Sequence, residues 1–213
     1  MRPRVLLNCA ATLDGRIAAA GGGPLRISDD DDLRRVHRMR ADCDAILVGV
    51  GTVLADDPSL RVKPEFAEGP DPLRVVLDTR LRTPRTARVL DGSAPTLVFH
   101  APDATSGLPP GMTDAVRRDP GGGLDLEAVL EVLRDGGVES LMVEGGASVL
   151  ASFLRAGLWD RWTLYQAPWT AGTGPGLPAF GPEAARLASA ERRGGGVLWT
   201  FEPAGRGGLA GAA

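Results

Sequence analysis

Short apolar runs rich in β-branched residues alternate along this chain with segments whose apolar residues recur at helical spacing. This alternation indicates α/β architecture, in which helices cover a mostly parallel sheet. Several of the runs are continuously apolar, as strands covered on both faces are. We expect strands at residues 5–10, 45–49, 74–77, 96–99, 140–143, 162–166 and 197–201.

The first helix is predicted to begin at Ser28, a residue type favoured at the N-cap, and to continue to Arg40. Its first turn holds residues 29–32, all aspartates, and their negative charge suits the positive end of the helix dipole. A metal site is the alternative for four aspartates, but consecutive residues of a helix point in different directions. We therefore predict a helix start here and no metal.

The rest of the chain suits a single domain. A second helix is predicted from an Asp125 cap to about Arg134, and a third from Gly145-Gly146 to Arg155, with surface loops at 63–72 and 102–123. The length of 213 residues and the 43% hydrophobic content are typical of one domain with a full core. We expect that domain to span residues 1–203 and the tail at 204–213 to be disordered.

Charge and cysteine content argue against several classes of protein. A formal net charge of −3 gives no general attraction to nucleic acid or to anionic membranes. No apolar run reaches the roughly 18 residues of a membrane helix, and no secretion signal is recognisable, so we expect a cytoplasmic protein. Two cysteines and two histidines are too few soft ligands for a zinc site.

The sequence V-E-G-G-A-S at residues 143–148 is the first candidate binding motif. A strand that ends in two glycines and opens a helix presents free backbone N–H groups and a positive dipole end, an arrangement that holds phosphate. Glu144 places a carboxylate at the carboxyl end of the strand, where open α/β sheets bind ligands. A tight strand-to-helix turn without a ligand is the alternative.

A second candidate motif follows the strand predicted at 45–49. Its G-V-G-T sequence suggests contact with a phosphate or a ribose, although the third glycine of a dinucleotide fingerprint and the lysine of a P-loop are both missing. The A-D-D-P sequence that contains Asp56 comes next. Taken alone, it is equally typical of a turn that ends a helix.

Two further stretches complete the set. In D-T-R-L-R, which follows the strand at 74–77, Arg80 and Arg82 would point to the same side of an extended segment. Two guanidiniums beside a threonine could clamp a phosphate monoester such as the one that distinguishes NADPH from NADH; a solvated basic edge is the alternative. Near the N-terminus Asn8 closes a buried strand, and such an amide usually has a partner or a ligand.

These stretches, in this order, resemble the pyrimidine reductases of riboflavin biosynthesis, which comprise the reductase half of a bifunctional bacterial enzyme and its stand-alone archaeal and fungal relatives. The resemblance covers about residues 4–202. It is carried by A-T-L-D-G-R at 11–16, R-I-S at 26–28, R-V-H-R-M-R-A-D at 35–42, G-V-G-T-V-L-A-D-D-P-S-L at 49–60, R-V-V-L-D-T-R-L-R at 74–82 and V-E-G-G-A-S at 143–148.

The resemblance implies a three-layer, dihydrofolate-reductase-like α/β fold that binds NADPH and commonly forms homodimers. It implies cofactor contacts from Ala10, Arg26, Thr52, Asp56, Thr79, Arg80, Leu81, Arg82, Gly145, Gly146, Ala147 and Ser148. It implies substrate contacts from Asn8, Arg40, Leu60, Lys63 and Glu144. Bifunctional relatives carry lysine in place of Asn8 and arginine in place of Lys63, and the asparagine is more similar to the archaeal stand-alone form.

The implied reaction is the NADPH-dependent reduction of the ribosylamino side chain of a pyrimidinone 5′-phosphate to the ribitylamino form. The ribosylamine opens to an imine, which accepts hydride better once protonated. Glu144 and Asp56 are the candidate catalytic residues that polarise or orient this centre. The H-x-E and P-C-x-x-C sequences of a zinc deaminase are absent, so we expect deamination to be left to another protein; whether it precedes the reduction stays open.

Two other functions stay open at this point. A related reductase of the same fold could use NADPH on a pterin or another substrate, but Arg40 and the phosphate-holding positions favour a small phosphorylated substrate. A non-catalytic nucleotide-binding module is the second alternative. The presence of Glu144 and Asp56 beside both glycine motifs favours an enzyme over such a module.

Overall fold

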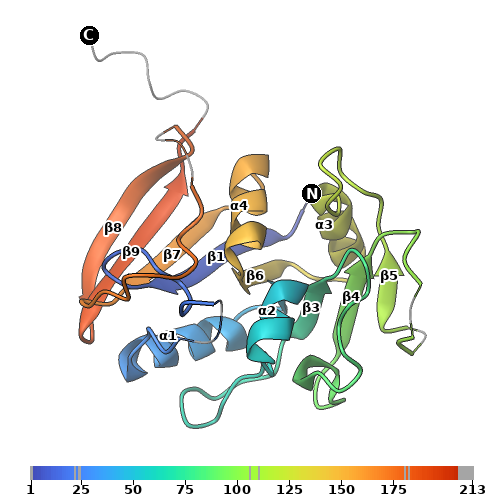
Figure 1. Ribbon diagram of the computed structural model, residues 1–213, viewed down its shortest axis with the longest axis horizontal. Coiled ribbons are helices and arrows are strands. Elements are labelled where there is room, and N and C mark those ends of the chain that lie inside the picture. Colours follow the sequence, from blue (N-terminus) through green and yellow to red (C-terminus); the bar gives the residue numbers. More distant parts are fainter. Residues whose placement is uncertain are drawn as a thin grey trace.

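The computed structural model describes residues 2–21, 23, 25–105, 107–109, 111–179, 181 and 183–205. Its strands are β1 (Arg4–Ala11), β2 (Ala45–Gly49), β3 (Leu73–Leu77), β4 (Thr96–His100), β5 (Thr113–Ala115), β6 (Ser140–Gly145), β7 (Arg161–Gln166), β8 (Ala185–Arg193) and β9 (Gly196–Pro203). Within the described residues they form one nine-stranded sheet in the order β5-β4-β3-β2-β6-β1-β7-β9-β8 (Figure 1). Neighbours from β5 to β7 are parallel, whereas β9 is antiparallel to both β7 and β8.

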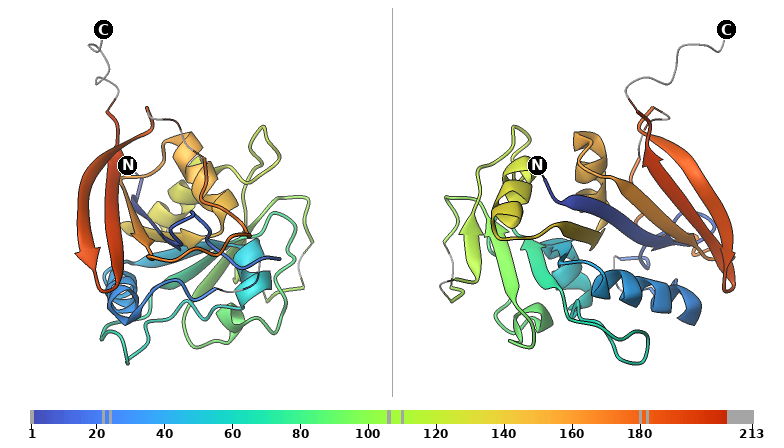
Figure 2. Two further views of the ribbon diagram at one scale, coloured as in Figure 1. Left: turned by 60° about the vertical axis from the view of Figure 1, so that its left-hand side comes forward. Right: turned by 180° about the vertical axis from the view of Figure 1, so that it is seen from behind.

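Helices cover both faces of this sheet. They are α1 (Asp30–Ala41), α2 (Val50–Asp56), α3 (Leu126–Asp135) and α4 (Ala147–Ala156), with a short 3-10 helix at Arg88–Leu90. Helices α1 and α2 lie on one face, and α3 and α4 lie on the other (Figures 1 and 2). The predicted three-layer architecture with a mostly parallel sheet is confirmed.

Alternate residues of the central strands face the two helical layers. In β2, Ala45 and Leu47 belong to the core that α3 and α4 cover, while Ile46 and Val48 pack with the apolar residues of α2 on the opposite face. Burial on both faces explains why this strand is apolar throughout.

The start of α1 differs from our prediction by one residue. Asp29, and not Ser28, is the N-cap: its carboxylate accepts the backbone N–H of Asp32 over 2.9 Å. The Ser28 hydroxyl instead donates to the buried Asp32 carboxylate over 2.5 Å. The predicted Asp125 cap of α3 is confirmed.

The sequence patterns did not predict α2, β5 or β8. Helix α2 has only seven residues and follows a glycine N-cap. Strand β5 lies inside the stretch 102–123 that we predicted as a loop, and that prediction is wrong at Thr113–Ala115. Strand β8 is exposed along most of its length and lacks the alternation of a half-buried strand. The disordered tail expected at 204–213 lies outside the described residues from position 206 onward.

Candidate active site

A pocket with a volume of about 750 Å³ opens at the carboxyl ends of β1, β2, β3 and β6. Strands β2 and β6 are neighbours, but the chain leaves β2 towards β3 and leaves β6 in the opposite direction, past β1 to β7. Such a reversal opens a crevice in which α/β proteins bind ligands. The expected site residues that line the pocket are Ala10, Arg26, Thr52, Asp56, Thr79, Arg82, Glu144, Gly146, Ala147 and Ser148.

The turn between β6 and α4 brings backbone N–H groups to this pocket. Gly146 is the N-cap of α4, and no side chain caps the first N–H groups of the helix. Its φ of +72° lies in the left-handed region that favours glycine. The positive end of α4 therefore meets a pocket that Ala147 and Ser148 line, which suits an anionic ligand.

Glycines allow the two strand-to-helix turns to approach each other closely. A Cβ atom at Gly145 would lie 3.1 Å from the Thr52 hydroxyl oxygen, and a Cβ at Gly146 would lie 3.3 Å from it. A Cβ at Gly49, the last residue of β2, would lie only 2.7 Å from Cγ2 of Val149 in α4. Gly145 thus has a packing role, and it does not itself line the pocket.

Glu144 projects from β6 into the pocket and is held by Arg40 of α1. The guanidinium donates from Nε and Nη2 to the two carboxylate oxygens over 2.8 and 2.6 Å. Burial alone would lower the pKa of Arg40, but the charge and the hydrogen bonds of Glu144 raise it above its ordinary value. This bidentate pair fixes the plane of the Glu144 carboxylate.

Asp56 is the last residue of α2, and it lines the same pocket. Asp57 is the C-cap of the helix, and its φ of +40° confirms the helix-ending turn that A-D-D-P allows. The Asp57 carboxylate accepts the Arg88 N–H over 2.8 Å, whereas Asp56 has no hydrogen-bond or ion-pair partner in the described part of the chain. Desolvation raises the pKa of Asp56 above its ordinary value.

The segment after β3 is a turn, so our prediction of an extended segment is wrong. Leu81 has a φ of +52°, and its N–H donates to the Asp78 carbonyl over 3.0 Å. The buried Asp78 carboxylate accepts the N–H and hydroxyl of Thr83 and holds the turn in place. As a result Arg82 lines the pocket, while Arg80 and Leu81 do not.

Four of the five expected substrate contacts do not line the pocket: Asn8, Arg40, Leu60 and Lys63. Asn8 is buried, and its side-chain oxygen accepts hydrogen bonds from Arg35 over 2.8 Å and from Thr163 over 2.9 Å. Its partners therefore belong to the protein. Leu60 is buried among apolar residues of α2 and β2. Lys63 is exposed, on the loop that Arg40 contacts through the Arg61 carbonyl.

The sequence motifs did not reveal other parts of the pocket wall. Cys9 lines the pocket, but burial raises the pKa of its thiol to about 12, which makes it a poor nucleophile. Asp14 does not line the pocket, but its carboxylate holds two segments together beside β1 by accepting the Thr12 hydroxyl and the N–H groups of Ala171 and Gly172. The Thr12 hydrogen bond is the main cause that lowers the pKa of Asp14 to about 2. The contacts with Ala171 and Gly172 join residues 157 and 158 positions apart in the sequence.

Within the described residues, no group of three or more histidine, cysteine or acidic side chains is placed to hold a metal ion. Among the same residues, no helix is both long enough and apolar enough to cross a membrane.

Comparison with known proteins agrees with the motifs. The family model of the RibD C-terminal domain matches residues 3–199. The 2,5-diamino-6-ribosylamino-4(3H)-pyrimidinone 5′-phosphate reductase of Methanothermobacter thermautotrophicus is 44% identical over 179 residues, which are 81% of this chain and 81% of that protein.

Solved structures agree as well. A diaminohydroxyphosphoribosylaminopyrimidine deaminase/5-amino-6-(5-phosphoribosylamino)uracil reductase from Thermotoga maritima superposes with a TM-score of 0.81 at 30% identity, covering 95% of this chain but only 57% of that one. Dihydrofolate reductase of Enterococcus faecalis, at 13% identity and a TM-score of 0.59, shares the fold alone. The dihydrofolate-reductase-like fold and the family resemblance are thus confirmed. The chain belongs to the RibD C-terminal domain family.

Proposed function

We propose that this chain catalyses the NADPH-dependent reduction of the ribosylamino side chain of a pyrimidinone 5′-phosphate to the ribitylamino form, a step of riboflavin biosynthesis. The observation that carries the proposal is the meeting of two family motifs, G-T-V-L-A-D-D-P and V-E-G-G, in a single pocket. The archaeal relative named for this reduction matches across most of the chain.

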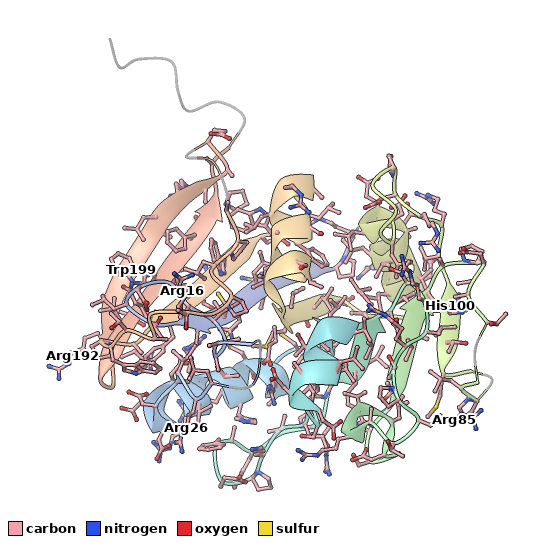
Figure 3. The ribbon with its side chains drawn as sticks, in the orientation of Figure 1. Arg16, Arg26, Arg85, His100, Arg192 and Trp199 are labelled. Atoms are coloured by element: carbon pink, nitrogen blue, oxygen red, sulfur yellow. The ribbon has the colours of Figure 1, made fainter. Side chains whose placement is uncertain are left out.

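The donor groups around the pocket fit a dinucleotide that carries an additional phosphate. The uncapped start of α4 suits a pyrophosphate, and Thr52 and Thr79 line the same pocket. Arg82 offers an exposed guanidinium for a phosphate monoester. Ala10 and Arg26 also line the pocket, and Arg26 is labelled in Figure 3. Bound NADPH would supply the hydride.

The two carboxyl groups of the pocket have different surroundings, and we assign them different roles. Reduction of the ring-opened imine places a hydride on C1′ and a proton on the attached nitrogen. Asp56 is unpaired and has a raised pKa, so it suits the proton donor. Glu144 already accepts two hydrogen bonds from Arg40, so it suits orientation of the pyrimidine by hydrogen bonding.

We place the phosphate end of the substrate near the loop that carries Lys63. Arg40 joins Glu144 to this loop, because its Nη1 donates to the Arg61 carbonyl over 2.9 Å. Leu60 anchors the start of this loop, because its side chain is buried among apolar residues of α2 and β2. Asn8 contributes indirectly, by holding Arg35 of α1 from β1.

Oxidation of NADPH followed at 340 nm would test this proposal. The substrates are the ribosylamino-pyrimidinone phosphate before and after deamination, with dihydrofolate as control. We expect turnover with at least one pyrimidine phosphate and none with dihydrofolate. Turnover with dihydrofolate alone would favour the alternative pterin-type reductase, and binding of NADPH without any turnover would favour a non-catalytic module.

We also propose that the protein acts as a homodimer in the cytoplasm, as the family resemblance implies. Sedimentation of the purified chain tests the first part, since a monomer at micromolar concentration would contradict it. Cell fractionation tests the second.

A further inference from the structure

His37 joins helix α1 to the loop that carries Lys63. The side chain is only 3% exposed, and its Nδ1 accepts the backbone N–H of Lys63 over 3.1 Å. Its ring stacks on Phe66, with ring centroids 5.1 Å apart and an interplanar angle of 18°. The N–H of Phe66 donates to the Lys63 carbonyl over 2.9 Å, which closes a turn around the histidine.

Arg40 contacts the same loop from the same helix. It follows His37 by three residues, a spacing that places two side chains on one helical face. Arg40 links the loop to Glu144 and hence to the pocket, whereas His37 fixes the backbone of Lys63 itself.

Lys63 is the cation that these contacts leave available. The charge of Arg40 is matched by Glu144, but Lys63 is exposed and has no ion-pair partner among the residues that the structure describes. Holding the Lys63 backbone in place before the ligand binds favours anion binding, because ordering the loop at binding would cost conformational entropy.

The hydrogen bond requires an unprotonated Nδ1. Burial lowers the pKa of His37 to about 4, and the charges of Arg40 and Lys63 act in the same direction, against those of Glu144 and Glu65. A neutral imidazole therefore accepts the Lys63 N–H at neutral pH and adds no charge beside the two cations.

We propose that His37 is a positioning residue, which holds Lys63 beside the Arg40–Glu144 pair to receive the phosphate group of the substrate. This inference rests on the proposed reductase function. It predicts that loss of the Nδ1 acceptor weakens substrate binding while the chemical step and cofactor binding stay intact.

The test compares His37→Leu, which removes the acceptor, with His37→Asn, whose side-chain oxygen can replace Nδ1. We expect His37→Leu to raise KM for the pyrimidine phosphate about tenfold, with kcat and the NADPH Kd changed less than about threefold. His37→Asn should restore most of the KM. His100→Leu is the matched control, because His100 lies on the other side of the molecule from α1 (Figure 3); it should leave KM unchanged.

A double-mutant cycle with Lys63→Ala identifies the route of the effect. If His37 acts through Lys63, His37→Leu adds little to the KM of Lys63→Ala. The proposal would be overturned if His37→Leu raised KM equally in the wild-type protein and in Lys63→Ala. It would also be overturned if His37→Leu lowered kcat alone.

Hydrogen exchange supplies a readout that needs no activity. In His37→Leu the Lys63 amide should lose protection, while the Val62 amide, which donates to the Asp71 carboxylate over 2.7 Å, should keep it. Unchanged protection at Lys63 would contradict the positioning role even in an active enzyme. Lost protection in a protein that reduces no pyrimidine phosphate would instead contradict the proposed function.

Discussion

The guanidinium of Arg40 holds both oxygens of the Glu144 carboxylate, although the two residues lie 104 positions apart in the sequence. The side chains of this pair are only 14% and 12% exposed, so the ion pair is shielded from solvent at the edge of the pocket. The pair links α1 to β6, the strand that leads into the turn before α4.

Glu144→Gln should lower kcat by about 100-fold, because glutamine keeps the size of the side chain but loses its charge and half of its acceptor capacity. The Kd of NADPH should change by less than about threefold, since the start of α4 is untouched. Steady-state kinetics and fluorescence titration of the cofactor measure the two quantities. Near-normal turnover would refute the role of Glu144.

Asp56→Asn should remove most of the activity and change its pH dependence. Because desolvation raises the pKa of Asp56, the acid form persists to a higher pH than in water, and kcat should fall as pH rises through that pKa. The variant should lack this limb of the profile. If kcat of the variant still fell over the same pH range, another group would be the proton donor.

The same substitution should not destabilise the apoprotein at pH 7. The folded state binds the Asp56 proton more tightly than the unfolded chain does, so its ionisation costs stability as pH rises. Asparagine removes that cost, and urea unfolding should show an equal or higher free energy of unfolding for Asp56→Asn. A clear loss of stability would mean that Asp56 has a structural partner.

Arg82→Ala should weaken NADPH binding far more than NADH binding, because Arg82 lines the pocket and is the guanidinium that we propose to bind the additional phosphate. Loss of this contact should cost about tenfold or more in the NADPH Kd. Arg80→Ala is the matched control: Arg80 is exposed outside the pocket, and its loss should change neither cofactor. If Arg82→Ala weakened the binding of NADPH and NADH equally, Arg82 would not be the residue that binds the additional phosphate.

Gly49→Ala should destabilise the fold by about 1–3 kcal/mol, since the new Cβ would lie 2.7 Å from Cγ2 of Val149. Adding Val149→Ala should recover part of this loss, because it removes the contact.

Gly51→Ala is the matched control. Nothing lies within 4 Å of a Cβ atom at Gly51, so the stability of the fold should not change. Because Gly51 lines the pocket, the added methyl group should weaken NADPH binding. Urea unfolding of Gly49→Ala, Val149→Ala, the double variant and Gly51→Ala measures these changes in stability. Strictly additive effects of Gly49→Ala and Val149→Ala would show that the two side chains do not clash.

His37 should make stability depend on pH in the acidic range. Its folded pKa of about 4 lies below the ordinary value of 6.5, so the stability from the neutral imidazole is present above pH 6.5 and is lost as pH falls through about 4. His37→Asn should show a shallower loss over this range in thermal unfolding. If the stability of the two proteins changed with pH in parallel, the pKa of His37 would not be lowered in the folded state.

The parts of the fold that follow from local pattern could be predicted. Strands such as β2 were recognisable because burial on both faces requires apolar residues throughout. Helix α2 was not, since a seven-residue helix that begins after glycine forms through packing of Val50 and Val53 on the sheet, which local propensity does not reveal.

The candidate site was predictable in its members more than in its contacts. The motifs named Glu144 and Arg40 but not their pairing, and they named Asn8 without its partner Arg35. The position of Arg82 depends on a turn that the buried Asp78 holds in place. The prediction that Arg80 and Arg82 point to the same side was wrong because it assumed an extended segment. Such contacts are set by tertiary structure.

A crystal structure of the protein with NADP bound would show where the cofactor lies. We expect density for the pyrophosphate at the start of α4, for the additional phosphate at Arg82, and for the nicotinamide facing Glu144 and Asp56. A cofactor bound elsewhere on the protein, with the turns at Gly49 and Gly146 empty, would contradict the proposal.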